Sequence, residues 1–409
     1  MNKSLKSVLK LIISLGLGVL IIFLVANNFK KPLKIKLDKN QLAQESQWVF
    51  KDWHPIGDYT LVGDTLGFAQ NQDDEVIPIT SIYEGEIQSK ELSAGQGIEA
   101  GDVLAKIKVD IWKVTKDAFG RANYWWLLLS VVFSLISHLS RAIRWKMLYK
   151  PMGYHPSTGN AFGAILVMYL SNLAFPRLGE VLRCTILNRY EKIPMTTSVG
   201  TMITERAIDV VSLLVLMGAC FIFQNQIFID FYNEYMPSGG GNTKFIILGV
   251  GGLGMVLLYL LYRTGKLPFA EKIKELVGSL WSGIISIKDL EKPWLFIGHS
   301  IFIWTMYLLM TGVCFYALPE TSNITLLAAL PTLFFGGIAM VAVQGGLGLY
   351  PYFVSKILLM YGLAETAGYA FGWVLWSAQT AVVVLAGLTA YVLLIVLNKE
   401  KNNPNLATS

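Results

Sequence analysis

The chain has 409 residues, of which 54% are hydrophobic and only 15% are charged. Soluble domains contain about 25% charged residues, so the composition excludes an ordinary soluble protein. The formal net charge of +6 would suit nucleic acid, but the basic residues gather in short segments between apolar runs. That distribution indicates a membrane protein with membrane lipids as its surroundings and no nucleic-acid partner.

The apolar runs, taken in chain order, predict the membrane spans, because about 20 apolar residues cross the hydrocarbon core as a helix. The first run follows three lysines, as in a signal peptide, but no small-residue cleavage site comes after it. We therefore predict an N-terminal anchor over residues 1–29. In all we predict six spanning helices, at residues 7–26, 124–149, 197–224, 244–262, 293–318 and 367–398.

A polar segment, residues 30–118, separates the first two spans. Its second half, Ile79 to Val109, alternates like short strands and has turns at Gly95 to Gly97 and at Gly101. It resembles half of a lipoyl-type barrel, without the lysine tip that carries lipoate or biotin. We predict a small β-rich extracytoplasmic insert that binds no cofactor and serves either as a docking surface for an extracytoplasmic protein partner or as a structural module.

Orientation follows from the basic residues of the short loops, which stay on the cytoplasmic side. Arginine and lysine crowd residues 141–150, 177–192 and 263–292, whereas residues 225–243 and 319–355 contain none. We therefore predict that both termini are cytoplasmic, including a tail at residues 399–409. Residues 266–290 predict an amphipathic surface helix, which either contacts anionic lipid or packs on the bundle.

Two apolar segments are too short to span, and each runs into helix-breaking residues. The first, Asn160 to Phe175, meets Pro176, and the second, Leu326 to Val343, meets a glycine-rich run. Each segment is expected to enter and leave by one face, the first from the cytoplasm and the second from outside. Matching breaks in two halves predict an inverted repeat around a transport site, although a proline alone can also mark a simple kink. The predicted break residues are Asn172, Pro176, Gly179, Gly345, Gly346 and Gly348.

Charged residues lie inside the third predicted span. Glu205 and Asp209 are four residues apart and share a helix face. Because a charge at the bilayer centre costs about 2.5 to 3.5 kcal/mol, we expect Asp209 to pair with Arg206, and Glu205 with Arg177 or Arg183. Guanidinium groups grip phosphate through two parallel hydrogen bonds, but the same cluster would also suit proton relay or a structural lock. The predicted substrate-binding residues are Arg177, Glu180, Arg183, Glu205, Arg206 and Asp209.

Four motifs in order carry a family resemblance. They are Ser140 to Trp145, Asn172 to Arg183, Glu205 to Asp209, and Gly345 to Gly348. Together they resemble the transmembrane domain of the lysylphosphatidylglycerol synthase and flippase-like family, over residues 119–398. The resemblance implies a bacterial inner-membrane protein related to a module that translocates aminoacylated phospholipids. The family's usual proline and following glutamate are absent around Gln344, which puts any coupling role of that acid in doubt.

The resulting fold prediction is an all-α polytopic membrane protein with six spans, two re-entrant hairpins and a β-rich insert. The predicted function is a carrier or flippase for a phospholipid or another lipid phosphate. The chain ends soon after the last span, so we expect no synthase activity, and we expect no catalytic residue, metal or cofactor. Two alternatives stay open: an intramembrane enzyme that modifies a lipid headgroup, and a membrane assembly scaffold.

Overall fold

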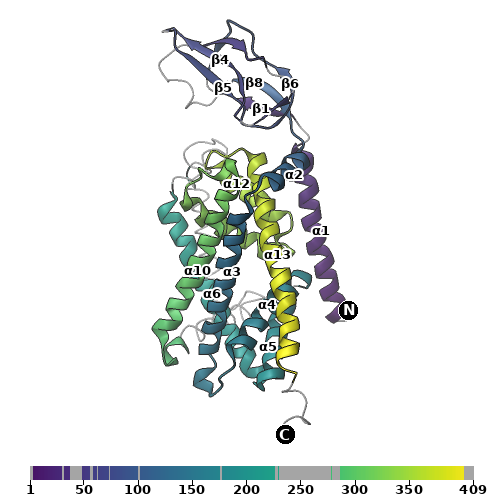
Figure 1. Ribbon diagram of the computed structural model, residues 1–409, viewed down its shortest axis with the longest axis vertical. Helices are drawn as coiled ribbons and strands as arrows, with labels where there is room; N and C mark the ends of the chain where they lie inside the picture. Colours follow the sequence, from purple (N-terminus) through teal and green to yellow (C-terminus); the bar gives the residue numbers. More distant parts are fainter. Residues whose placement is uncertain are drawn as a thin grey trace, which may run out of the picture. The chain divides into compact units, whose positions relative to one another are not determined.

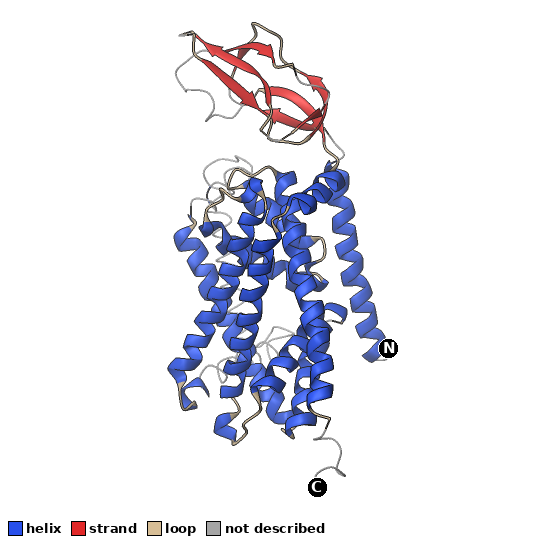
Figure 2. Cartoon of the chain, in the orientation of Figure 1, coloured by secondary structure: helices blue, strands red, loops and turns tan. Residues whose placement is uncertain are grey.

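The computed structural model describes residues 3–29, 32–36, 48–225, 229, 278 and 286–399, apart from short gaps at 56–58, 62, 73, 100–101, 176 and 226–228. The described part is mostly helical, as Figure 2 shows in blue. Five helices are long and apolar enough to cross a membrane, which supports a polytopic membrane protein. The predicted span at 244–262, the break residue Pro176 and most of the predicted amphipathic helix lie outside the described residues.

The five candidate spans correspond to five of the six predicted ones. They are Leu11–Phe29, Tyr124–Met152, Met195–Phe223, Pro293–Ala317 and Glu365–Leu397. Figure 1 labels the long helices of these spans as α1 (Lys3–Phe29), α3 (Tyr124–Met147), α6 (Met195–Phe223), α10 (Pro293–Cys314) and α13 (Glu365–Leu397).

The chain forms two compact units. One contains Met1–Tyr124, Phe315–Ile324 and Phe335–Ser377, and the other contains Trp125–Cys314, Thr325–Phe334 and Ala378–Ser409. The first unit therefore carries the β-rich insert and the second break, whereas the second unit carries the first break and the charged part of α6.

The described residues of the insert form two four-stranded sheets, drawn in red in Figure 2. Apolar residues from both sheets are almost fully buried, among them Phe50, Leu66 and Ile79 of one sheet and Leu104 and Ile107 of the other. The sheet orders are β1-β8-β6-β3 and β5-β4-β2-β7, with antiparallel pairing throughout. The strands are β1 (Leu33–Lys36), β2 (Trp48–Trp53), β3 (Tyr59–Thr60), β4 (Thr65–Asn71), β5 (Val76–Thr80), β6 (Gly85–Lys90), β7 (Gly97–Ile98) and β8 (Val103–Lys108).

The helix α2 (Ile111–Arg121) follows the insert and was not predicted. Asp110 caps it by accepting hydrogen bonds from the backbone N–H groups of Trp112 and Lys113. Ile111 is buried against Phe29 of α1, whereas Trp112 is exposed. Such a helix, apolar on one side and carrying an exposed tryptophan on the other, suits the border between membrane and water.

The second break separates two short apolar helices, α11 (Ala329–Ala342) and α12 (Leu349–Leu359). Between them lies the 3-10 turn η6 (Gln344–Gly346). Gly345, Gly346 and Gly348 all have positive φ angles, of 61°, 70° and 74°. Only glycine adopts this backbone region without a steric cost, which explains why the helix ends here. Further short 3-10 turns are η3 (Phe315–Ala317), η4 (Pro319–Thr321) and η5 (Leu326–Ala328).

In the second unit, the first break separates α4 (Thr158–Ala174) from α5 (Leu178–Glu191), which pack side by side (Figure 1). Gly179 allows the contact, because an added Cβ would meet the backbone carbonyl oxygen of Met168. The side-chain oxygen of Asn172 accepts a hydrogen bond from the Gly179 N–H at 2.8 Å. Asn172 and Gly179 thus fix the turn around the break. The remaining turns are η1 (Lys150–Met152) and η2 (Ser286–Asp289).

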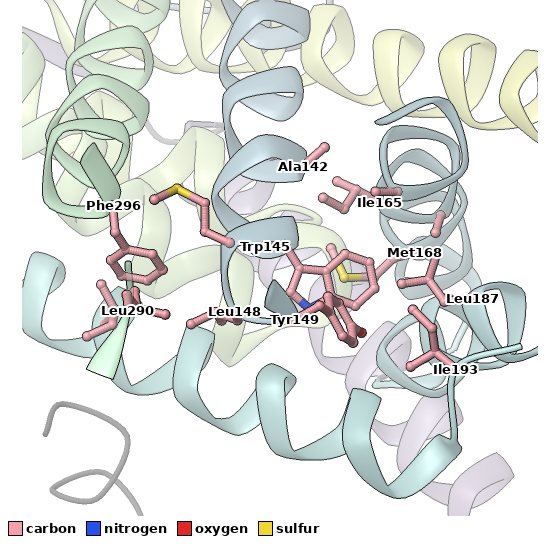
Figure 3. Close-up of a cluster of buried hydrophobic side chains, with 14 residues drawn as sticks. Ala142, Trp145, Leu148, Tyr149, Ile165, Met168, Leu187, Ile193, Leu290 and Phe296 are labelled. Atoms are coloured by element: carbon pink, nitrogen blue, oxygen red, sulfur yellow. The ribbon is translucent and has the colours of Figure 1, made fainter. Parts of the chain in front are cut away.

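A buried apolar cluster packs α3 against the α4–α5 pair and the start of α10 (Figure 3). Trp145 lies at its centre and is fully buried, with Tyr149, Met168, Leu187 and Phe296 around it. Close packing of this kind holds side chains in single positions, so it helps to fix Arg144, the fully buried neighbour of Trp145 that lies over the Phe296 ring.

Candidate functional site

Two carboxylates of α6 form the centre of a buried ionic cluster in the second unit. Glu205 is fully buried and Asp209, one helical turn later, keeps a side-chain exposure of 15%. Their spacing places both on the α6 face that looks toward α3 and α5, as their ion pairs show.

Arg141 and Arg144 of α3 bind both carboxylates. Arg141 donates hydrogen bonds to Glu205 at 2.8 Å and to Asp209 at 2.7 Å. Arg144 donates to Asp209 at 2.9 Å and to the Ser300 hydroxyl of α10 at 2.9 Å. The sequence interpretation that Arg141 and Arg144 are loop charges is therefore wrong. Both lie within α3 and are at most 4% exposed, because the acids of α6 compensate their charge inside the bundle.

Arg183 of α5 completes the cluster from the other side. Its Nη1 donates to Glu205 at 2.6 Å, and the side chain has no exposed surface. The guanidinium lies over the Trp145 ring, 4.6 Å from its centroid, a cation–π contact that holds the flat group in place. The structure thus pairs Glu205 with one of the two arginines that the sequence proposed for it.

Arg206 lies at the margin of the cluster. Its Nη1 is 3.8 Å from Asp209, the local pair expected from the sequence, and 41% of its side chain is exposed. Its Nη2 lies 3.9 Å from the sulfur of Met168 on α4. Arg206 is therefore the arginine of the cluster that solvent or lipid reaches most easily.

The structure does not bring Arg177 and Glu180 into this cluster. Arg177 is exposed, precedes α5 with a left-handed φ of 65°, and makes no ion pair with another described residue. Glu180 accepts a long hydrogen bond from Asn172 at 3.4 Å, across the first break. A substrate role for Arg177 and Glu180 stays a prediction, whereas Arg183, Glu205, Arg206 and Asp209 lie together.

The cluster holds more positive than negative groups. Four guanidinium groups face two carboxylates, and the described residues add no further acid within ion-pair distance of them. Several buried N–H groups find no hydrogen-bond partner among the described residues: the Nε atoms of Arg141, Arg144, Arg183 and Arg206, and Nη2 of Arg183. Unused buried donors with excess positive charge suit an anion with several oxygen atoms.

Sequence reasoning missed Arg141 and Arg144 as site residues. The available signal was their spacing of three residues on one face of an apolar helix, within the Ser140 to Trp145 motif. The positive-inside rule accounts for basic residues at a helix end without any partner, so it does not point to the α6 acids.

Comparisons with known proteins agree with this description. The family model of the lysylphosphatidylglycerol synthase TM region matches residues 108–394. The chain is 24% identical over 180 residues to the glycosyltransferase AglD of Haloferax volcanii, which is 42% of this chain and 28% of that protein. It is also 24% identical over 148 residues to the UPF0104 membrane protein MJ1595 of Methanocaldococcus jannaschii, which is 35% of this chain and 41% of that protein.

The match with these relatives spans less than half of their own length. No solved structure matches the chain. The family match covers well over half of this chain and includes α3 to α6, which carry the ionic cluster, and the second break. The resemblance drawn from the four sequence motifs is thereby confirmed: this multi-pass membrane protein belongs to the lysylphosphatidylglycerol synthase TM region family.

Proposed function

We propose that the protein is a carrier that moves a lipid with an anionic, phosphate-bearing headgroup across the bacterial inner membrane. The headgroup phosphate binds to Arg183 and Arg206, while Arg141 and Arg144 hold the two carboxylates in place. Glu205 and Asp209 keep the guanidinium groups oriented and reduce their repulsion. Transport of this kind involves no covalent chemistry and therefore needs no catalytic residue.

The observation that carries the proposal is the excess of buried guanidinium over carboxylate. An uncompensated charge in a low-dielectric interior is costly, and ionisable groups within a membrane span mark a binding or transport path more often than a simple packing contact. Arg183 has two unused N–H donors, on Nε and Nη2. That edge matches two oxygen atoms of one phosphate, which a lysine in the same place would not.

The proposed architecture is an inverted repeat of two broken hairpins. The order α3, α4–α5, α6 is followed by α10, α11–α12, α13, so a short broken pair follows a long apolar helix in each half. We propose that each pair re-enters from one face, and that residues 244–262 supply a sixth span. Breaks at matching places are typical of carriers whose site lies near the midplane.

The proposed topology places both termini in the cytoplasm and the insert outside. Single cysteines at Arg177 and Gln344, introduced after the native Cys184, Cys220 and Cys314 are replaced by alanine, test it through labelling by a membrane-impermeant maleimide, added to intact cells or to inverted vesicles. We expect Arg177→Cys to react from the cytoplasmic face and Gln344→Cys, at the half-buried start of the glycine turn, from the outer face. Labelling of both from one face would overturn the inverted repeat.

A headgroup-modifying enzyme is the second candidate, favoured by the printed name of one relative, a glycosyltransferase. That match covers 28% of the relative, so the activity of its whole chain does not transfer by itself. A membrane scaffold is a third candidate, which the β-rich insert would suit. Both are outcomes of the same experiment.

The experiment is reconstitution of the purified protein into liposomes that contain an isotopically labelled anionic phospholipid. Transport is measured as the arrival of the unchanged lipid in the opposite leaflet. Chromatography of the extracted lipid detects any change of its headgroup. A changed headgroup would support the enzyme. An unchanged lipid that stays in its original leaflet would exclude both transport and headgroup modification and would favour the scaffold.

A matched pair of variants on α5 tests the site itself. Arg183→Lys keeps the charge but loses the flat guanidinium edge, so we expect transport to fall about ten- to hundredfold, the value of a hydrogen bond to a charged group. Arg189→Lys changes an exposed arginine on the same helix and should transport like the parent. Equal transport by both variants would remove Arg183 from the proposed site.

A further inference from the structure

Helix α1 contacts the second break through its backbone. An added Cβ at Gly18 would lie 2.8 Å from the carbonyl oxygen of Leu347, and one at Gly348 would lie 2.7 Å from the carbonyl oxygen of Gly18. Real Cβ atoms do not approach other atoms so closely, so this crossing requires glycine in both segments. A helix that only anchored the chain would need no such fit.

The hydrogen bonds at the break also depend on α1. Gln344, the first residue of η6, donates its backbone N–H to the Ser14 hydroxyl at 2.8 Å. From α13, the Trp376 Nε1 donates to the carbonyl oxygen of Gly345 at 2.7 Å. A broken helix frees backbone groups that lipid cannot satisfy, and here side chains of two neighbouring helices satisfy them.

The contacts lie on one face of α1. Ser14 and Gly18 are one turn apart, and Val25 and Phe29 continue the same face into a buried cluster with Tyr369. Gly16 is on the opposite side, with no atom within 4 Å of an added Cβ. The contact with the second break is therefore confined to one face of α1, since Gly18 is tightly packed and Gly16, two residues earlier, is not.

An aromatic series on α13 connects the outer end of that face to the break. The Phe29 ring packs at a tilt against Tyr369, with ring centroids 5.9 Å apart, and edge-to-face contacts follow between Tyr369 and Trp373 at 6.2 Å and between Trp373 and Trp376 at 5.4 Å. Trp376 then reaches the Gly345 carbonyl. The Ser14 end of the contact face thus touches the glycine turn directly, and the Phe29 end is connected to it through the aromatic residues of α13.

We propose that α1 is a positioning helix of the second hairpin, in which Ser14 and Gly18 hold the glycine turn at 344–348 in its broken conformation. This role goes beyond membrane anchoring, and the family match does not supply it, because α1 lies outside residues 108–394. It does not depend on which lipid the protein carries.

Hydrogen exchange of the full-length protein in lipid nanodiscs tests the inference, read on the peptide that contains Gln344. Ser14→Val removes the acceptor, so we expect exchange there to become about fivefold faster, the value of one hydrogen bond. Ser14→Thr keeps the hydroxyl and should restore the parent rate. Gly18→Leu should accelerate the same peptide, and Gly16→Leu should not.

Parent-like exchange in Ser14→Val and Gly18→Leu would overturn the inference. So would equal acceleration by Gly16→Leu, because the effect would then come from any bulk added to α1. Failure of the proposed transport would leave these rates unchanged, so the two proposals fail separately.

Discussion

Replacing Glu205 by glutamine should damage the ionic cluster more than replacing any one of its arginines. The Glu205 carboxylate lies 2.8 Å from Arg141, 3.6 Å from Arg144 and 2.6 Å from Arg183. Glu205→Gln leaves Arg141 and Arg144 with Asp209 as their carboxylate partner, and it leaves Arg183 with no carboxylate partner among the described residues. Breaking a buried ion pair by removing one member costs about 3 to 5 kcal/mol, and we expect a loss of that size.

The comparison variant is Arg183→Gln. It removes one partner of Glu205, but Arg141 still holds the other carboxylate oxygen, and the excess of positive charge falls. We therefore expect a smaller loss, of about 1.5 to 3 kcal/mol, the value of one charge-assisted hydrogen bond. Glu291→Gln, which changes an acid 62% exposed and 3.8 Å from Lys150, serves as control and should cost less than about 0.5 kcal/mol.

Reversible unfolding in mixed micelles of a mild detergent and dodecyl sulfate measures all three free-energy changes on one scale. The predicted order of destabilisation is Glu205→Gln, then Arg183→Gln, then Glu291→Gln. An equal or larger loss for Arg183→Gln would refute the reasoning, since the cluster would then not be organised around the α6 carboxylate.

Two further stability predictions concern the packing of α4 in the second unit. Gly179→Ala should destabilise the protein by about 1 to 3 kcal/mol because the added Cβ meets the Met168 carbonyl. Gly159→Ala places its Cβ in free space and should stabilise the protein by about 0.5 to 1 kcal/mol. The free energies of unfolding of the two variants should therefore change in opposite directions. Asn160 and Asn398 donate to each other at 3.1 and 2.9 Å, so a double-mutant cycle with leucine should give a coupling of about 0.6 to 1.7 kcal/mol, and a coupling near zero would show that the amides do not act as a pair.

The sequence predicted the elements whose signal is local. Apolar length was enough to place the spans that correspond to α1, α3, α6, α10 and α13. The glycine run at 345–348 was enough to place a helix break, because the positive φ angles there are a property of glycine itself.

The partners of the charged residues could not be read in the same way. Arg141 and Arg144 meet the α6 acids about 65 residues further along the chain, and a count of basic residues assigns both arginines to a loop. Arg177 belongs to the same motif as Arg183, yet the left-handed backbone at Arg177 leaves its side chain exposed while Arg183 is buried one and a half turns later.

The insert and α1 show the same limit. Strands β1, β2 and β4 lie in the first half of the insert, for which the sequence predicted no strands, and each pairs with a strand that includes residues of the second half: β1 with β8, β2 with β7 and β4 with β5. The fit of Gly18 against Leu347 joins segments more than 300 residues apart. Composition describes α1 as an apolar anchor and cannot reveal which of its glycines is in contact.

The central claim is that the buried arginines select a negatively charged phosphate lipid, and a charge series tests it most directly. Liposomes with the reconstituted protein would carry one fluorescent lipid each: phosphatidylglycerol, phosphatidylcholine or diacylglycerol, with the label on an acyl chain. Dithionite quenching measures the rate at which each lipid reaches the outer leaflet. We predict that phosphatidylglycerol crosses fastest and that Arg183→Lys removes its advantage, whereas equal rates for all three lipids, or rates no higher than in protein-free vesicles, would contradict the account.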